Sequence, residues 1–206
     1  MRSRMAPTSW QVVWLGAALV GCSNGTKDAT IPKFDPAAAT AAAQAEFDAN
    51  GDGKFSEEEL KKSPGLAAAL AAFDGDNDAS LSADELKAGL EKFRLEGASL
   101  ITLTCRVSHN GGPLEGATVT LVPEPFMGEA LKPATGVTAS TGGAGLSVAD
   151  EEIPAAVRGK VKGAHCGIFR VVVTHPTVKV PAKYNTETEL GRVVSRRNND
   201  TVTIDF

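Results

Sequence analysis

Residues 48–59 carry oxygen-bearing side chains at intervals that suit a hard divalent cation. Ca²⁺ binds about six to eight oxygen atoms in a flexible cage, and a loop can supply them from its positions 1, 3, 5, 7, 9 and 12. Those positions are held by Asp48, Asn50, Asp52, Lys54 (through its backbone carbonyl), Ser56 and Glu59. Gly53 at position 6 allows the left-handed backbone at which such a loop turns. Mg²⁺ requires shorter bonds in octahedral geometry, so the spacing favours calcium.

A second stretch, residues 74–85, repeats this spacing. Its oxygen ligands are Asp74, Asp76, Asp78, Ser80 (through its backbone carbonyl), Ser82 and Glu85. The two stretches resemble the calcium-binding loops of the EF-hand family, and the resemblance covers about residues 36–95. It implies two helix–loop–helix units that pair through a short antiparallel bridge between Phe55 and Leu81. Ala79 departs from the family at loop position 6, where glycine is expected, so we expect strain there.

Helix signals surround both loops. The dipeptide Asp35–Pro36 is typical of a helix start, and residues 36–47 are rich in alanine, which favours helix. Ser63–Pro64 is a second such start, and Ser-x-x-Glu patterns ending at Glu59 and Glu85 predict a capping box after each loop. A duplicated dockerin-like calcium repeat is an alternative that fits less well, because a full helix precedes the first loop. The predicted core of this half comprises Leu60, Leu66, Leu70, Phe73, Leu86, Leu90 and Phe93.

After residue 97 the sequence changes to a two-residue alternation typical of half-buried strands. Gly and Pro clusters separate the alternating runs, which favours an antiparallel β-sandwich. The apolar residues expected to face its core are Ile101, Leu103, Cys105, Val107, Val119, Leu121, Phe169, Val171, Val173, Val202, Ile204 and Phe206. Residues 110–123, 163–171 and 180–184 resemble the carboxypeptidase regulatory-like, or transthyretin-like, family over about residues 99–206. The resemblance implies a non-enzymatic β-sandwich used for stability, adhesion or ligand contact.

Residues 1–21 are typical of a targeting segment rather than of folded structure. Two arginines precede an apolar run over residues 10–20, which is shorter than the roughly 20 residues that span a bilayer. The sequence Leu19-Val20-Gly21-Cys22 resembles a bacterial lipobox. This resemblance implies that Cys22 is lipidated and begins an exported protein anchored to a membrane of the cell envelope. An ordinary cleaved signal peptide with a chance cysteine is the alternative.

We therefore expect a multidomain α + β chain. Residues 1–21 form the lipoprotein signal peptide and residues 22–35 a polar tether. Residues 36–97 form the helical EF-hand pair, and residues 98–206 form an antiparallel Ig-like or transthyretin-like β-sandwich.

The charge distribution separates the two halves. The chain has a net charge of −4, but residues 23–97 hold 8 basic and 15 acidic residues, while residues 98–206 hold 11 and 10. The acidity thus gathers around the two loops, where bound cations would offset it. No basic footprint suggests a nucleic-acid partner. Three histidines (His109, His165 and His175) lack the spacing of zinc ligands, and no catalytic motif is present, so we expect no enzyme.

Cys105 and Cys166 are the two cysteines of the β half. An exported chain meets oxidising conditions, and a bridge closing about 60 residues would stabilise the fold by roughly 4 kcal/mol. Against a bridge, Cys105 is expected on the apolar face of its strand, whereas the alternation around Phe169 places Cys166 on the opposite face. The sequence is compatible with both a disulfide and two buried thiols.

These features together favour a calcium-binding, lipid-anchored envelope protein. The ion serves either to fix the helical pair or to regulate how the β half is presented to an unknown protein or glycan partner. An adhesion or carbohydrate-contacting module is a second hypothesis, and an accessory subunit of an envelope hydrolase is a third. Affinity capture from solubilised membranes, with and without a chelator, distinguishes them by the partner recovered.

Replacing Cys22 with Ala should release the protein from the membrane fraction, because the variant lacks the thiol that carries the lipid. Fractionation of cells that express each form measures the change. A Cys22→Ala variant that still sediments with membranes, or an unmodified residue 22 in the mass spectrum of the wild type, would contradict the prediction.

Overall fold

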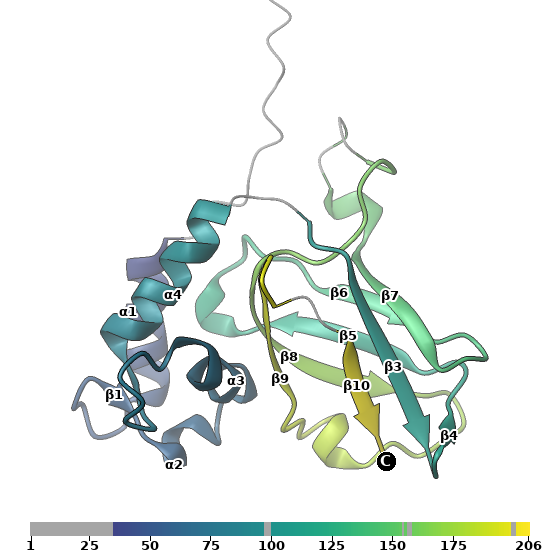
Figure 1. Cartoon of the computed structure of the whole chain (residues 1–206), viewed down its shortest axis with the longest axis horizontal. Helices are drawn as coiled ribbons and strands as arrows, with labels where there is room; N and C mark the ends of the chain where they lie inside the picture. The colour runs from purple at the N-terminus through teal and green to yellow at the C-terminus, as the bar shows by residue number, and fades with distance from the viewer. Residues whose placement is uncertain (1–34, 97–99, 154, 156–157, 199–200) are drawn as a thin grey trace, which may run out of the picture.

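The computed structural model describes residues 35–96, 100–153, 155, 158–198 and 201–206 of the 206-residue chain. It has a mixed α + β architecture, in which four described helices precede a curled β-sheet that forms a half-barrel (Figure 1). The expected signal peptide, Cys22 and the tether up to residue 34 lie outside the described residues. Within the described part, no helix combines the length and apolar content needed to cross a membrane.

The helical half contains α1 (Pro36–Phe47), α2 (Glu57–Leu60), α3 (Pro64–Phe73) and α4 (Ala83–Glu96). The predicted helix starts are confirmed: the Asp35 side chain accepts a hydrogen bond from Ala37 N at 2.9 Å, and Ser63 Oγ accepts one from Leu66 N at 3.2 Å. The predicted bridge is confirmed as well. Strands β1 (Lys54–Phe55) and β2 (Leu81–Ser82) pair antiparallel, with Phe55 opposite Leu81.

The predicted helical core is largely as expected. Five of its seven side chains are buried, and Leu70 and Phe73 are partly buried against them. Phe73 and Phe93 stack with their ring centroids 5.6 Å apart. Phe47 of α1 also meets Phe126 of the β half edge-on, with their ring centroids 6.3 Å apart, so one core continues from the helices into the β half.

The sheet runs in the order β10-β3-β7-β6-β5-β8-β9, with β4 paired to β3. Its strands are β3 (Leu103–His109), β4 (Gly112–Pro113), β5 (Thr118–Pro123), β6 (Ala134–Val137), β7 (Gly143–Val148), β8 (Gly167–Thr174), β9 (Gly191–Val194) and β10 (Val202–Asp205). Short 3₁₀ turns lie at η1 (Pro125–Met127), η2 (Asp150–Glu152) and η3 (Ala182–Tyr184). The predicted inward-facing residues are buried, except Phe206, which is partly buried.

Two features differ from the expected antiparallel sandwich. The strands form one continuous curled sheet, and β10 pairs parallel to β3, with Val202 opposite Cys105. A hairpin would force antiparallel pairing, but β10 follows β9, which lies at the other edge of the sheet. No hairpin turn joins β10 to β3, so a turn does not set the direction of β10.

Helix α3 joins the two halves by packing against β8 and β9. Its first turn donates a hydrogen bond from Gly65 N to Glu124 Oε1 at 2.8 Å, and the Glu124 side chain is only 2% exposed. Burial raises the pKa of Glu124. Gly191 is the first residue of β9 and lies against the first turn of α3. A Cβ atom added there would overlap the carbonyl oxygen of Pro64. The close approach of α3 to β9 therefore requires glycine at this position.

We expect Gly191→Ala to lower the free energy of unfolding by about 1–3 kcal/mol, because the added methyl group meets rigid backbone. Gly145→Ala is the matched control, since a Cβ on Gly145 of β7 meets nothing within 4 Å. Chemical denaturation followed by circular dichroism measures both. Equal losses in the two variants would show that α3 does not press on β9 as described.

Candidate metal centre

The first loop folds around the carboxylate of Asp48, which ends α1. Asp48 Oδ1 accepts hydrogen bonds from Gly51 N at 2.7 Å and Asp52 N at 3.2 Å, and Oδ2 accepts one from Gly53 N at 2.9 Å. Gly51 and Gly53 have positive φ angles of 71° and 82°, which glycine adopts without steric cost. The backbone thus wraps the side chain predicted at loop position 1.

Glu59 closes this loop from the first turn of α2. Its Oε1 accepts from Ala49 N at 2.8 Å, and its Oε2 accepts from Ser56 N at 2.8 Å and Ser56 Oγ at 2.7 Å. These bonds, those from Ser56 first, lower the pKa of Glu59 to about 2. Because the pKa is lowered on folding, this stabilisation is present above pH 4.5 and is lost as the pH falls towards 2. The predicted capping box is confirmed.

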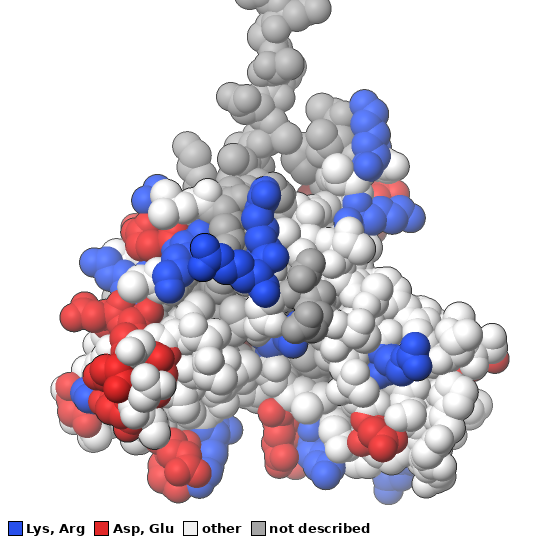
Figure 2. Space-filling model, in the orientation of Figure 1, with Lys and Arg blue, Asp and Glu red and all other residues white. Residues whose placement is uncertain are grey.

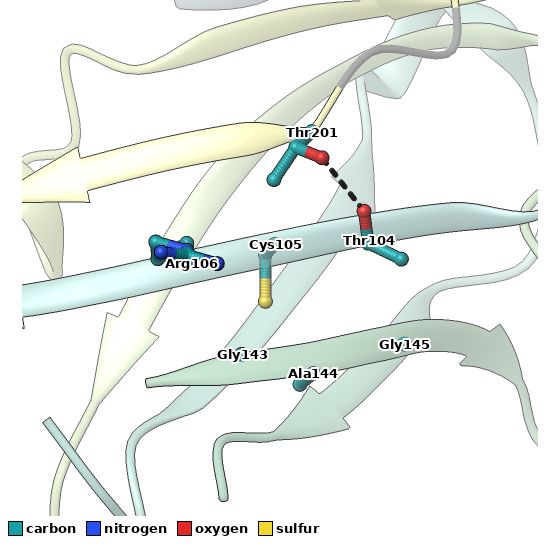
Figure 3. A pocket seen from close by; sticks show the side chains of 7 residues that line it. All are labelled: Thr104, Cys105, Arg106, Gly143, Ala144, Gly145 and Thr201. Carbon is teal, nitrogen blue, oxygen red and sulfur yellow. Dashed lines mark hydrogen bonds between the residues drawn. The ribbon is translucent and has the colours of Figure 1, made fainter. Parts of the chain in front are cut away.

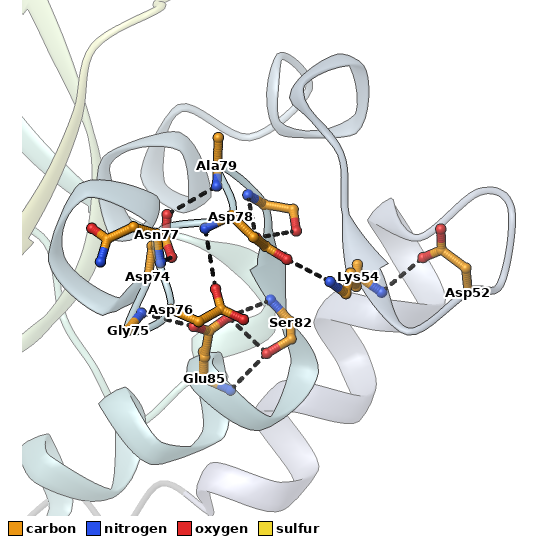
Figure 4. A network of polar contacts seen from close by, with 11 residues as sticks. Asp52, Lys54, Asp74, Gly75, Asp76, Asn77, Asp78, Ala79, Ser82 and Glu85 are labelled. Carbon is orange, nitrogen blue, oxygen red and sulfur yellow. Dashed lines mark hydrogen bonds and ion pairs between the residues drawn. The ribbon is translucent and has the colours of Figure 1, made fainter.

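The second loop gathers three carboxylates into one cluster. Asp74, Asp76 and Asp78 each offer an oxygen, and these oxygens lie within 4.8 Å of one another (Figure 4). Within the described ranges this is the one group of three or more His, Cys, Asp or Glu side chains that could hold a metal ion. Backbone amides orient the cluster, since Asp74 accepts from Asn77 N at 2.6 Å and Asp78 accepts from Ser80 N at 2.8 Å.

Glu85 is held apart from the cluster by its own cap. Its Oε1 accepts from Gly75 N at 2.7 Å, and its Oε2 accepts from Ser82 N at 2.9 Å and Ser82 Oγ at 2.7 Å. These bonds, led by the one from Ser82 N, lower the pKa of Glu85. The side chain is therefore ionised near neutral pH and lies beside the loop that it is predicted to close.

A cross-loop ion pair joins the two candidate sites. Lys54 Nζ of the first loop lies 2.5 Å from Asp78 Oδ2 of the second (Figure 4). The hydrogen bond from Lys54 is the main reason that the pKa of Asp78 falls to about 2. Sequence reasoning assigned Lys54 only a backbone carbonyl and missed this contact. The available signal was the bridge itself, which places Lys54 opposite Ser82, close to the second loop.

Ala79 adopts the strained backbone that the sequence predicted. Its φ is 61°, and the neighbouring Asn77 also has a positive φ of 60°. Asn tolerates this region, whereas a left-handed backbone costs alanine roughly 1–2 kcal/mol. The second loop therefore turns at a higher conformational cost than the first, where Gly51 and Gly53 hold the corresponding angles.

The arrangement suits a hard cation. Each loop presents carboxylates, hydroxyls and amide oxygens, and it includes neither histidine nor cysteine, which softer metals prefer. The residues that would hold an ion are Asp48, Asn50, Asp52, Lys54 (carbonyl), Ser56 and Glu59 in the first loop, and Asp74, Asp76, Asp78, Ser80 (carbonyl), Ser82 and Glu85 in the second. An ion would neutralise carboxylates that otherwise repel one another.

The two cysteines of the β half are not bridged. Cys105 and Cys166 are both buried thiols, and Cys105 of β3 faces Ala144 of β7 at the floor of a shallow hollow (Figure 3). Burial raises the pKa of the Cys105 thiol. Cys166 is buried although the alternation points it away from the core. Ile168, two residues further on and on the same face by that alternation, lies against Gly65 of α3, so the outer face of β8 is covered there. Of the two alternatives, the structure has buried thiols in place of the possible disulfide.

The three histidines do not gather into a metal site within the described residues. His109 Nδ1 contacts the carbonyl oxygen of Phe206 at 2.9 Å, and His175 Nε2 contacts that of Glu115 at 2.8 Å. Burial lowers the pKa of His165.

Comparison of the chain with models of protein families, with curated proteins and with solved structures gave no match.

Proposed function

We propose that the helical half binds two calcium ions, one in each loop. The observation that carries this proposal is the second loop, where three carboxylate oxygens lie within 4.8 Å of one another. A fourth carboxylate, that of Glu85 on α4, is bonded to the backbone of the same loop. The β1–β2 bridge supports it further, because it places the two loops side by side as a pair. Calcium is favoured over magnesium because these loops offer many oxygens on a pliant backbone, whereas magnesium dehydrates reluctantly.

The proposal extends to an exported protein that a lipid on Cys22 anchors in the bacterial cell envelope. Its β half is a non-enzymatic module that contacts a protein or glycan partner. Outside the cytoplasm calcium is abundant, and modules there work with dissociation constants of about 10⁻⁴–10⁻³ M. Even a strained loop can therefore be filled in that environment.

Calorimetric titration of the detergent-solubilised protein with CaCl₂ tests the proposal. We expect two binding events in the wild type, of which Glu59→Gln and Glu85→Gln each remove a different one. The first loop should be the tighter site, because the strain at Ala79 and the ion pair to Asp78 both oppose binding in the second. The calcium assignment would be contradicted by a titration in which Ca²⁺ produces no binding signal. Equal affinity of the sites for Mg²⁺ would contradict it as well.

Lys54→Met should tighten the second site by about two- to fivefold, because it removes an ammonium group that competes with the ion for Asp78. The first site should keep its affinity, since its predicted ligand from this residue is the backbone carbonyl. Lys61→Met is the matched control, because Lys61 pairs with Glu58 outside both ligand sets. A Lys54→Met protein whose weaker site is unchanged would show that the ion pair does not oppose binding.

A further inference from the structure

A shallow groove of about 420 Å³ lies where the last turns of α4 meet the end of β9. Lys92, Leu95 and Arg197 line it together with the rings of Phe73 and Phe93. The Leu95 side chain is 76% exposed, more than any other large hydrophobic residue in the described part of the chain. A single exposed leucine is common on protein surfaces, so its meaning depends on the residues around it.

Basic residues lie near this exposed leucine, since Lys92 and Arg197 line the same groove and Arg94 precedes Leu95 in α4. We define the basic end as Lys92, Arg94, Leu95, Arg196 and Arg197, all of which are exposed. Figure 2 shows Lys and Arg side chains gathering over the upper end of α4, whereas Asp and Glu gather over the loops below. Glu91 offsets part of this charge, because Arg94 Nε lies 2.6 Å from Glu91 Oε2.

The first described helix begins at the same end. Helix α1 leads into the first loop, α4 leads out of the second, and the two loops are paired through β1 and β2. Helices α1 and α4 lie side by side and are antiparallel, so both extend from the loops towards the same end of the helical half (Figure 1). The start of α1 at Pro36 therefore lies at the end of the helical half that carries the basic end.

We infer that the basic end docks on an anionic phospholipid surface, with Leu95 entering the headgroup region. The inference rests on the proposed lipid anchor, because Cys22 precedes α1 in the chain and a lipid on it would bring a membrane towards the end at which α1 begins. Basic side chains next to an anionic leaflet strengthen binding about fivefold each, and an apolar side chain adds to this attraction. Charge complementarity and the direction of the chain thus identify the same face.

The arrangement also keeps the acidic loops away from the lipid charge. The 14 residues of α4 span about 21 Å from the second loop to the basic end. This distance exceeds the Debye length of about 8 Å at physiological salt, so the loops feel little of the surface potential. Carboxylates and lipid phosphates would repel each other in the reverse orientation, which opposes it.

Vesicle co-sedimentation tests the inference in the full chain carrying Cys22→Ala, which cannot be lipidated. We compare vesicles of phosphatidylcholine with vesicles that also contain phosphatidylglycerol. We expect about 30-fold weaker binding to the anionic vesicles in the triple variant Lys92→Gln, Arg94→Gln, Arg197→Gln. This loss corresponds to two full charges, because Glu91 already offsets the charge of Arg94. The control Lys61→Gln, Lys132→Gln, Lys179→Gln removes the same charge elsewhere and should change binding less than twofold.

Leu95→Ser should weaken binding to the anionic vesicles about tenfold, which separates the apolar contact from the charge. Every protein in the series shares residues 1–34, so these contribute equally. Equal binding by the two triple variants, equal binding to both kinds of vesicle, or no binding would overturn the inference. Self-association that the basic-end variant abolishes would assign the surface to a second copy of the chain instead. If only the proposed lipid anchor is wrong, cell fractionation of Cys22→Ala shows it. If only the proposed calcium binding is wrong, calorimetry shows it, so neither result is confused with a failure of the vesicle test.

Discussion

The contact between α3 and the β8–β9 edge is the constraint on which the rest of the structure depends. The helix begins where Gly65 N meets the buried Glu124 carboxylate, and it ends at Asp74, the first residue of the second loop. Burying a carboxylate is unfavourable unless it is hydrogen bonded, so the amide at the helix start and the carboxyl group require each other. This contact fixes the second loop relative to the sheet, and the β1–β2 bridge passes that restraint to the first loop.

Both loops use hydrogen bonds to hold negative charge together. Asp48 and Asp74 are surrounded by backbone amides, and Glu59 and Glu85 are bonded to the serine that begins the next helix. These bonds reduce mutual repulsion among the carboxylates and orient them without an ion. The second loop needs Lys54 in addition, because its cluster is denser. The proposed ion would have to displace this counter-charge from Asp78, which would weaken its binding to the second loop.

The local structure of this chain could be predicted from the sequence, whereas its long-range contacts could not. Helix starts and the inward strand faces follow from spacing rules that act over a few residues. The Phe55–Leu81 bridge and the strain at Ala79 are expected from the resemblance of the two loops to EF-hand loops. Glu124 carried no comparable signal, because a glutamate between two prolines is typical of an exposed turn. The parallel β10 and the covered outer face of β8 depend on segments that are far apart in the chain, and no local pattern records such pairing.

The same geometry favours a structural role for the proposed ions over a switching role. A regulatory opening would move α3 relative to α4, but α3 is fixed by Glu124 and by the close approach of Gly191 to Pro64. Moving it would leave a buried carboxyl group without its amide partner, at a cost of about 1–3 kcal/mol or more. An ion at 100 times its dissociation constant adds about 2.7 kcal/mol to the folded state. Because α3 ends at the second loop and packs on the sheet, binding of the proposed ions would stabilise the junction between the two halves.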